Sequence, residues 1–492
     1  MPPYRLRPSP LRLAPLVALA ALSACEVGPN YKRPATPTPT TYKEVEGWAP
    51  AHPADAADRA DWWTVFNDPV LNDLEQRVEV SNQNLAAAEA AYRQARALVS
   101  QQRAALFPTV NLNGSANVSG GGSGGGGAGT GTGTTGVGAG GRGTSQSYRL
   151  ELGATWEPDI WGKIRRTIEN ASANAQASAA DLANARLSAQ TEVAVDYIQL
   201  RQLDEQKRIL DATVDAYAKS LTIARNKYNA GTSAKGDVLQ AQTQLENTRA
   251  SDTDLAQQRA KLEHAIAILT GRPPAEVSIA PADWTLAPVD IPPGLPSTLL
   301  ERRPDIAAAE RKTAAASANI GVATSAYYPT LDLSGSGGTA ASKIGQLFSA
   351  SSLLWALGAT AAETVLDFGA RHAQVEQAKA AFDVATANYR QTVLTAFGQV
   401  EDNLAAQRVL AAEQTDRRAA LADSDEALKI VQNQYRAGTV DYTSVVVAQA
   451  TALNTHNAEL SVEAARLTTT VDLIAALGGG WNAGTDPNVG TK

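Results

Sequence analysis

Helical periodicity of apolar residues dominates this chain. Residues 163–230 contain neither Gly nor Pro, and a helix of that span would be roughly 100 Å long at about 1.5 Å per residue. Later in this segment, apolar positions recur at alternating steps of four and three residues: Leu210, Val214, Tyr217, Leu221, Ala224 and Tyr228. Similar steps follow Gly231, at Val238, Ala241, Leu245, Thr248, Leu255, Leu262, Ile266 and Leu269. Heptads on both sides of a tight glycine turn predict an antiparallel coiled-coil hairpin.

Alternation with a period of two identifies shorter segments as strands. The stretch "TVNLNGSANV" has an apolar side, made of Val110, Leu112, Ala116 and Val118, and a polar side, made of Asn111, Asn113, Ser115 and Asn117. The stretch "YRLELGATW" alternates in the same way, with an apolar side made of Tyr148, Leu150, Leu152, Ala154 and Trp156. Each has about the length of a tilted, membrane-crossing β-strand. Later, Leu331 and Leu333 alternate with polar residues, whereas a return strand near 353–361 is less regular.

The whole arrangement occurs twice. The stretch "NKYNAGTSAKGDVLQAQ" from Asn226 corresponds to "NQYRAGTVDYTSVVVAQ" from Asn433, which is 433 − 226 = 207 residues later. The stretch "LFPTVNLNGS" from Leu106 corresponds to "YYPTLDLSGS" from Tyr327, which is 327 − 106 = 221 residues later. The offset changes within the glycine-rich segment 119–143, so an insertion there identifies this segment as a loop. Internal duplication is therefore the main organising feature of the chain.

These patterns predict six parts. They are a signal peptide (1–24), an extended linker (25–60), a first repeat (61–271), a Pro-rich connector (272–296), a second repeat (297–478) and a C-terminal tail (479–492). Each repeat is expected to hold a helix, two strands and a coiled-coil hairpin. The strands are expected near 108–118, 147–157, 329–338 and 352–364, and the hairpins near 163–270 and 370–477. The first helix is expected to run unbroken from about 68 to 105, and the connector to carry one short β-like run around Val277.

Targeting signals occupy the N-terminus. Three arginines precede an apolar run at 13–22, which is too short to span a bilayer as a helix. The run ends in "LSAC", and Cys25 is the only cysteine of the chain. We expect cleavage before Cys25 and acylation of its thiol and new amino group, which would hold the protein on a membrane. The alternative is an ordinary signal peptide with a chance Cys. Because Glu26 follows instead of Asp, the outer membrane is favoured.

Composition excludes several classes of function. With 43 Lys+Arg against 50 Asp+Glu the formal charge is −7, and removal of the three leader arginines gives −7 − 3 = −10. No basic patch suits nucleic acid. The four histidines lack metal-ligand spacing, so neither metal nor cofactor is expected. The formal matches to G-x-S-x-G at 121–125 and to G-x-G-x-x-G at 124–129 lack a following helix. An enzyme is therefore not expected.

Four amphipathic strands cannot close a barrel, for which about eight are needed. Unpaired edges in lipid would cost several kcal/mol for each unsatisfied backbone group. The chain is therefore expected to oligomerise: a dimer would supply eight strands and a filled interior, and a trimer twelve strands around water. The alternative is a long coiled-coil lipoprotein whose strands form an ordinary soluble sheet.

The motifs point to a family. They occur in order as "CEVGPNYKRP" from Cys25, "WWTVFNDPVLNDL" from Trp62, "WEPDIWGKIRR" from Trp156, "ERRPDIAAAE" from Glu301 and "LGGGW" from Leu477. With the duplication, this chain resembles the TolC-like outer-membrane factors of tripartite efflux pumps, in the lipoprotein branch that works with RND pumps. The resemblance implies a mainly α fold with a β-barrel part: a homotrimer with a twelve-stranded transmembrane β-barrel and a twelve-helix periplasmic α-barrel, closed at its tip at rest.

The resemblance also implies a function and site residues. The expected function is a passive exit duct for small molecules, docked to a periplasmic adaptor and an inner-membrane RND pump. The adaptor-docking tip is expected at the two Ala-Gly-Thr turns: Ala230, Gly231, Thr232, Ala437, Gly438 and Thr439. The gate is expected near Asp237, Asp441, Val445, Val446 and Val447.

In the second repeat the family often has Asp and Arg where this chain has Val447 and Ala450. Apolar packing would then close the duct in place of an ionic ring; alternatively, Val445 to Val447 simply pack a coiled coil. Two rival functions are the outer-membrane factor of a type I protein exporter and a structural envelope lipoprotein that conducts nothing.

Overall fold

The computed structural model describes residues 26–36, 38–45, 61–120, 144–287, 289 and 302–479. By internal contacts it forms two units. The strand unit comprises Met1–Lys32, Ala95–Ala173 and Ala314–Val384, and the helical unit comprises Arg33–Gln94, Asn174–Thr313 and Ala385–Lys492. Each unit takes segments from both sequence repeats. Among the described residues, no helix combines the length and the apolar character needed to cross a membrane.

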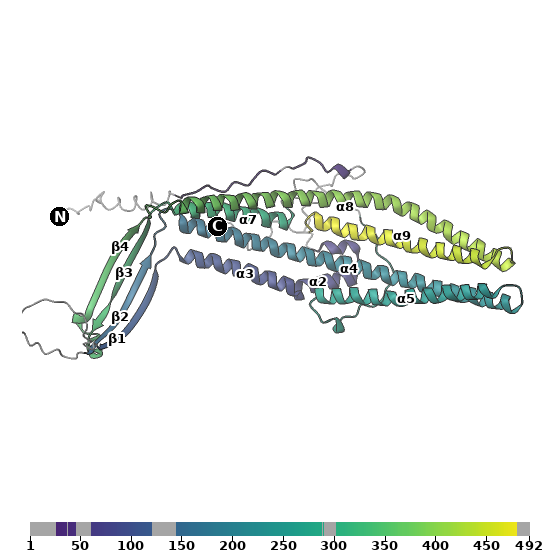
Figure 1. Cartoon of the computed structure of the whole chain (residues 1–492), viewed down its shortest axis with the longest axis horizontal. Coiled ribbons are helices and arrows are strands. Elements are labelled where there is room, and N and C mark those ends of the chain that lie inside the picture. Colours follow the sequence, from purple (N-terminus) through teal and green to yellow (C-terminus); the bar gives the residue numbers. More distant parts are fainter. Residues whose placement is uncertain are drawn as a thin grey trace, which may run out of the picture. The chain divides into compact units, whose positions relative to one another are not determined.

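The strand unit contains one antiparallel sheet with the order β1-β2-β3-β4. Its strands are β1 (Thr109–Gly120), β2 (Thr144–Trp156), β3 (Thr330–Ala341) and β4 (Leu353–Ala362) (Figure 1). Two short 3-10 helices, Ile344–Gln346 and Ala350–Ser352, lie between β3 and β4. Chain neighbours are sheet neighbours throughout, so β1 and β4 form the two outer edges.

One face of this sheet is apolar across all four strands. The register pairs Leu112 with Leu152, Leu152 with Gly337, and Gly337 with Trp355. Directly paired residues point to the same face. The return strand β4, irregular in sequence, therefore places Leu353, Trp355 and Leu357 on the same face as the apolar residues of β1 and β2. These side chains are exposed: 68% for Leu112, 74% for Trp355 and 80% for Leu357. The opposite face carries Asn111, Asn113 and their polar neighbours.

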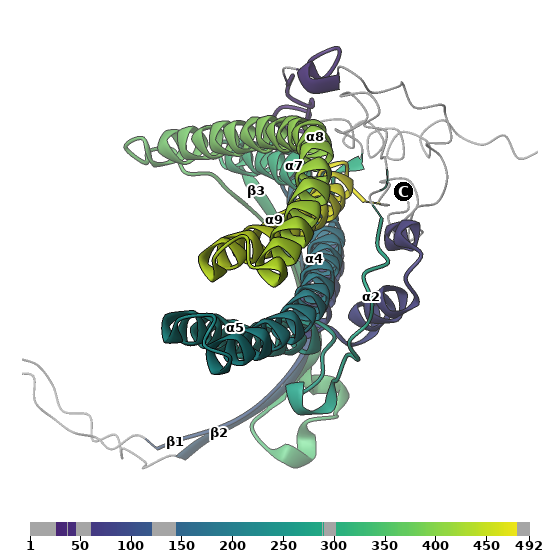
Figure 2. The same cartoon turned by 90° about the vertical axis from the view of Figure 1, so that its right-hand side faces the viewer.

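Most of the chain is helical. The long helices form two hairpins, α4 (Lys163–Asn229) with α5 (Lys235–Leu269), and α8 (Ala370–Ala437) with α9 (Tyr442–Ala476). Three shorter helices are α2 (Pro69–Ser81), α3 (Gln83–Ala104) and α7 (Pro304–Ser325). In the helical unit, α5 runs back along α4 and α9 runs back along α8, and Figure 2 views these two hairpins end on. Polar contacts join the members of each hairpin, for example Gln244 to the Tyr217 hydroxyl (3.3 Å) and Gln407 to Thr470 (2.7 Å).

The expected first helix is not continuous. Asn82 is extended (φ −65°, ψ 121°), so α2 ends at Ser81 and α3 begins at Gln83. The Asn82 side chain accepts hydrogen bonds from the backbone N–H groups of Asn84 and Leu85, at 2.9 and 3.1 Å, and donates to the Leu269 carbonyl at 2.7 Å. An N-cap residue has a non-helical backbone, so the helix is interrupted at Asn82, which caps α3 and also binds the end of α5.

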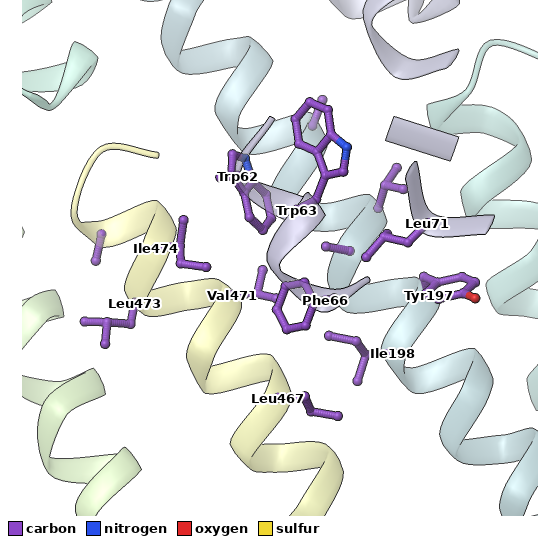
Figure 3. Packing of buried hydrophobic residues seen from close by; sticks show 14 of the residues in the cluster. Trp62, Trp63, Phe66, Leu71, Tyr197, Ile198, Leu467, Val471, Leu473 and Ile474 are labelled. Carbon is purple, nitrogen blue, oxygen red and sulfur yellow. The ribbon is translucent and has the colours of Figure 1, made fainter. Parts of the chain in front are cut away.

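A large hydrophobic core lies in the helical unit (Figure 3). Trp62 and Trp63, in the short 3-10 helix Trp62–Phe66, meet edge to face at 5.9 Å, and Trp63 is only 1% exposed. Figure 3 shows Trp62, Trp63 and Phe66 beside residues of α4 and α9, including Ile198 and Val471. Asp68 starts α2 by accepting from the Val70 and Leu71 N–H groups, and it also accepts from the Tyr197 hydroxyl at 2.7 Å. The N-terminal segment is thereby attached to the long helix α4.

A buried ionic network holds the connector against the first hairpin. Asp204 accepts from Arg201 at 2.9 Å and from Arg259 at 2.7 Å, and Arg201 also donates to the Ala280 carbonyl at 2.8 Å. The β-like run around Val277 is extended after the 3-10 helix Pro274–Glu276, but it belongs to no sheet. It packs instead through Ile279 and Leu286, which are buried in the core.

Glu75 is a buried acid on α2. It is 0% exposed, and neither of its carboxyl oxygens has a hydrogen-bond partner within the described chain. Burial, with a smaller contribution from Glu79, raises the pKa of Glu75 to about 9. The carboxyl is therefore neutral in the folded protein at pH 7.

We expect Glu75→Gln to reduce the pH dependence of folding stability. The ordinary pKa of a glutamate is 4.5, so above that pH unfolding releases a proton that the folded state retains until about pH 9. Native stability should therefore fall as pH rises from 5 to 9, by up to about 1.4 kcal/mol per pH unit. Urea unfolding followed by tryptophan fluorescence would measure it. The exposed Glu89 supplies the control, Glu89→Gln, which should keep the native slope; an equal slope in native protein and Glu75→Gln would contradict the assignment.

Candidate functional site

The two Ala-Gly-Thr segments form the same turn. Gly231 has φ +74° and Gly438 has φ +80°, the left-handed conformation that glycine adopts without steric cost. The threonine after each glycine donates both its backbone N–H and its hydroxyl to a carbonyl five residues earlier. Thr232 donates to Lys227 at 2.9 and 3.0 Å, and Thr439 to Gln434 at 3.0 Å in both bonds. Each turn is therefore a Schellman-type helix end reinforced by a threonine hydroxyl. All six Ala-Gly-Thr residues are exposed.

The helices that follow these turns begin differently. Asp441 is the N-cap of α9, and its carboxylate accepts from the Ser444 N–H at 3.0 Å and the Ser444 hydroxyl at 2.9 Å. These bonds, the backbone one first, lower the pKa of Asp441. The equivalent position before α5 is Ala234, which has no side chain for capping. Asp441 therefore serves as a cap, so the second turn is held more firmly than the first.

A small hydrophobic cluster joins the two hairpins behind the turns; we call it the tip core. It contains residues from all four long helices: Tyr217, Leu221, Ala224, Ala241, Leu245, Tyr435, Tyr442 and Val445. Tyr435 and Tyr442 meet at a centroid distance of 5.4 Å and an angle of 60°. Burial, with smaller contributions from Tyr435, Tyr217 and Asp237, raises the pKa of Tyr442 to about 12. The tip core is therefore uncharged at neutral pH and links the first hairpin to the second.

Lys227 makes a polar link between the two hairpins. Its ammonium nitrogen lies 3.9 Å from the centre of the Tyr435 ring, and it donates a hydrogen bond to the Tyr435 carbonyl. A cation over an aromatic face is attracted by the ring quadrupole. Sequence reasoning missed this pair, although both residues lie in the repeated motif. The available signal was the departure from the repeat, since Gln434 occupies the equivalent position in α8.

The three valines that were expected at the gate have three different environments. Val445 is 1% exposed inside the tip core, Val446 packs at its margin, and Val447 is 60% exposed. A helix turns by about 100° per residue, so three consecutive residues cannot face the same way. Asp237 is half-buried in the first turn of α5, and Asp441 is exposed. Of the expected gate residues, Val445 has the surroundings of a packing residue, and Val447 has a free side chain.

Other candidate chemistry is limited. No group of His, Cys, Asp and Glu among the described residues could hold a metal ion. His456 contacts Asp425 at 3.0 Å on the exposed surface of the second hairpin. Cys25 lies outside the described residues, as does the segment with the two formal glycine motifs.

Comparison with known proteins gives one family. Residues 74–272 and 295–479 match the family described as outer membrane efflux protein. A relative from Pseudomonas putida, the antibiotic efflux pump outer membrane protein ArpC, is 28% identical over 464 residues, which cover 94% of this chain and 93% of the relative.

Solved structures agree with this match. The outer-membrane channel OprN has a TM-score of 0.84 at 30% identity, covering 93% of this chain and 100% of its own. The open state of the MtrE outer membrane channel of Neisseria gonorrhoeae has a TM-score of 0.79 at 26% identity, covering 94% and 100%.

We expect Lys227→Met to loosen the junction of the hairpins. The variant keeps an apolar stem but loses the cation–π contact and the bond to the Tyr435 carbonyl, together about 1–2 kcal/mol. Amide hydrogen exchange near the ends of α4 and α8 should then become roughly 5–30-fold faster. The repeat-equivalent change Gln434→Met is the matched control and should leave exchange unchanged. Equal protection in native protein and Lys227→Met would show that this contact does not hold the hairpins together.

Proposed function

Since this chain belongs to the outer membrane efflux protein family, we propose that it is the outer-membrane exit duct of a tripartite efflux pump. In this role it conducts small molecules passively to the exterior, and energy comes from an inner-membrane RND pump through a periplasmic adaptor. The relatives support this role, because ArpC is named as the outer membrane protein of an antibiotic efflux pump and OprN as an outer-membrane channel.

The sheet carries this proposal. Its apolar face exposes Leu112, Leu152, Trp355 and Leu357 without cover from the rest of the described chain, and its other face is mainly polar along β1, β2 and β3. That pattern suits a strand with lipid on one side and water on the other. Four strands leave two open edges, which are costly in lipid. Three copies would pair these edges and give a twelve-stranded barrel with a water-filled interior, anchored in the outer membrane by lipid on Cys25.

The hairpins supply the periplasmic part of the duct. Three copies would contribute twelve helix segments to an α-barrel, with six exposed Ala-Gly-Thr turns at its tip. We propose that the adaptor docks on these turns, because they expose backbone and small side chains on rigidly capped helix ends.

Closure of the duct would depend on the residues beside the tip core. Val447 is exposed on α9 at a position where the family often has Asp, and we propose that Val447 residues of the three copies form an apolar constriction. Val446, at the margin of the tip core, contributes less. Val445 and Tyr442 keep the hairpins together, and Asp441 fixes the start of α9. Opening would separate the hairpins at the tip core, a change between two packed arrangements.

The decisive experiment is conductance of the purified protein in a planar bilayer. Native protein should insert as heat-resistant trimers with a mostly closed, low conductance. Val447→Asp should raise this conductance, and Val446→Asp should raise it less, because charged side chains repel one another and draw water into an apolar constriction. Val447→Leu, which remains apolar, should stay as closed as native protein.

Two outcomes would count against the proposal. If the native protein never forms trimers, or if neither native protein nor any variant conducts, the proposed duct would be overturned. Trimers that conduct, but with Val447→Asp as closed as Val447→Leu, would overturn only the apolar constriction.

A further inference from the structure

The two repeats correspond residue by residue in the sheet. The offsets of 221 for β1 to β3 and 207 for β2 to β4 come from the sequence alone. Applied to the observed pair Thr109 and Thr155, they give 109 + 221 = 330 and 155 + 207 = 362, and Thr330 and Ala362 are indeed partners. For any contact from repeat 1 to repeat 2, these offsets therefore give the equivalent pair of residues, in which repeat 2 takes the place of repeat 1 and repeat 1 that of repeat 2.

One such contact joins the repeats where strands meet helices. Trp161 follows β2, and its ring stacks on Tyr328 at 4.9 Å with an angle of 26° between the planes. Its indole N–H donates to the Pro329 carbonyl at 2.8 Å. An aromatic side chain after the second strand of repeat 1 thus closes onto the residues just before the first strand of repeat 2.

The offsets also give the residues that would make the equivalent contact from repeat 2 to repeat 1, and within one chain these residues do not meet. Trp161 corresponds to Phe368 (161 + 207), and Tyr328 and Pro329 correspond to Phe107 and Pro108 (328 − 221 and 329 − 221). Phe368 is 93% exposed and Phe107 is 69% exposed. Phe107 precedes β1 and Phe368 follows β4, so the two rings belong to opposite outer edges of the sheet.

Phe368 is held in its exposed position. Its backbone is left-handed (φ +51°), which is rare for a bulky residue and tends to persist where it has a role. The preceding Asp367 fixes this turn, because its carboxylate accepts from the Gly369 N–H at 3.1 Å, the Arg371 N–H at 3.0 Å and the Arg371 side chain at 2.7 Å. A fixed and uncovered aromatic ring is suited to pack against a partner.

We propose that Phe368 of one copy packs on Phe107 and Pro108 of a second copy of this chain, as Trp161 packs on Tyr328 and Pro329 within one copy. This aromatic clasp rests on the proposed trimeric duct and gives its interface a definite residue pair. The same translation sets the register of the strands that meet there. The observed pair Leu152 and Gly337 becomes Ala359 (152 + 207) opposite Ala116 (337 − 221) of the second copy.

The register can be tested by cross-linking full-length chains in outer membranes with a short bifunctional thiol reagent. The double variant Ala116→Cys/Ala359→Cys should give covalent dimers and trimers. Within one chain Ala359 is in register, through Leu333 and Trp156, with the residue before Thr109, which is 116 − 108 = 8 residues from Ala116. The two positions are therefore about 26 Å apart along the strands and three strand spacings, about 14 Å, apart across the sheet, so a link must join two copies. The control Leu112→Cys/Ala359→Cys is displaced by four residues, about 13 Å, and should link weakly or not at all. Native protein, whose only cysteine is Cys25, gives the background. A stronger ladder from the control than from the matched pair would overturn the register.

The clasp can be tested by heating purified trimers and following their dissociation on gels. Phe107→Ala and Phe368→Ala should each lower the dissociation temperature by several degrees. The double variant should lower it no further than the more affected single variant, because either change removes the same contact. Phe348→Ala, which changes an 80% exposed phenylalanine between β3 and β4, should dissociate like native protein.

Two results separate the clasp from the duct itself. The clasp alone would be overturned if the protein still forms conducting trimers and the effects of Phe107→Ala and Phe368→Ala on the dissociation temperature are additive. The same holds if both variants dissociate like native protein. Native protein that is monomeric and silent in bilayers would overturn the proposed function and the clasp with it.

Discussion

Backbone N–H and C=O groups along the outer edges of β1 and β4 have no partner strand within the described chain. This constraint organises the rest of the molecule. A sheet with one apolar face and two open edges is not a stable end state in lipid, because unsatisfied peptide groups are costly there. Other copies of the chain can satisfy them, and duplication provides edges of matching length and pattern. Each pair of strands is followed in the chain by one long helical hairpin, so the same duplication applies to the helices.

The two repeats share the same arrangement of elements, but equivalent positions differ in their residues and contacts. Asn82 holds the end of α5 through the Leu269 carbonyl, and at the equivalent place Arg303 donates to the Ala476 carbonyl at the end of α9. The geometry is conserved between the repeats although the chemistry differs. At the tip the two repeats differ in their contacts: α9 has a capping aspartate, α5 has none, and Lys227 contacts the Tyr435 ring. The repeats are therefore alike in the strands and in the bases of the hairpins, and they differ at the tip.

Sequence reasoning could find the features that depend on local pattern. The alternation in β1 and β2 and the absence of Gly and Pro from α4 are visible in a short window. The features that it could not find depend on distant partners. The break at Asn82 needs the Leu269 carbonyl, which lies 187 residues away. A run of three valines does not reveal which one faces the neighbouring hairpin, because that depends on the rotation of α9 against the tip core. The apolar face of β4 is defined by the pairing of Trp355 with Gly337 on β3, a residue without a side chain to signal it.

The base of each hairpin is sterically locked by a close backbone approach. A Cβ atom on Gly271 would lie 2.0 Å from the Ser81 carbonyl oxygen, and one on Gly478 would lie 2.3 Å from the Arg302 carbonyl oxygen. The returning helices α5 and α9 each have 35 residues, so each extends about 52 Å from its base. A long helix held at its base in this way can act as a lever with a fixed pivot. Over this length a tilt of about 5° at the base would move the far end of the helix by about 4–5 Å, so a small change at the glycine would become a large one at the tip.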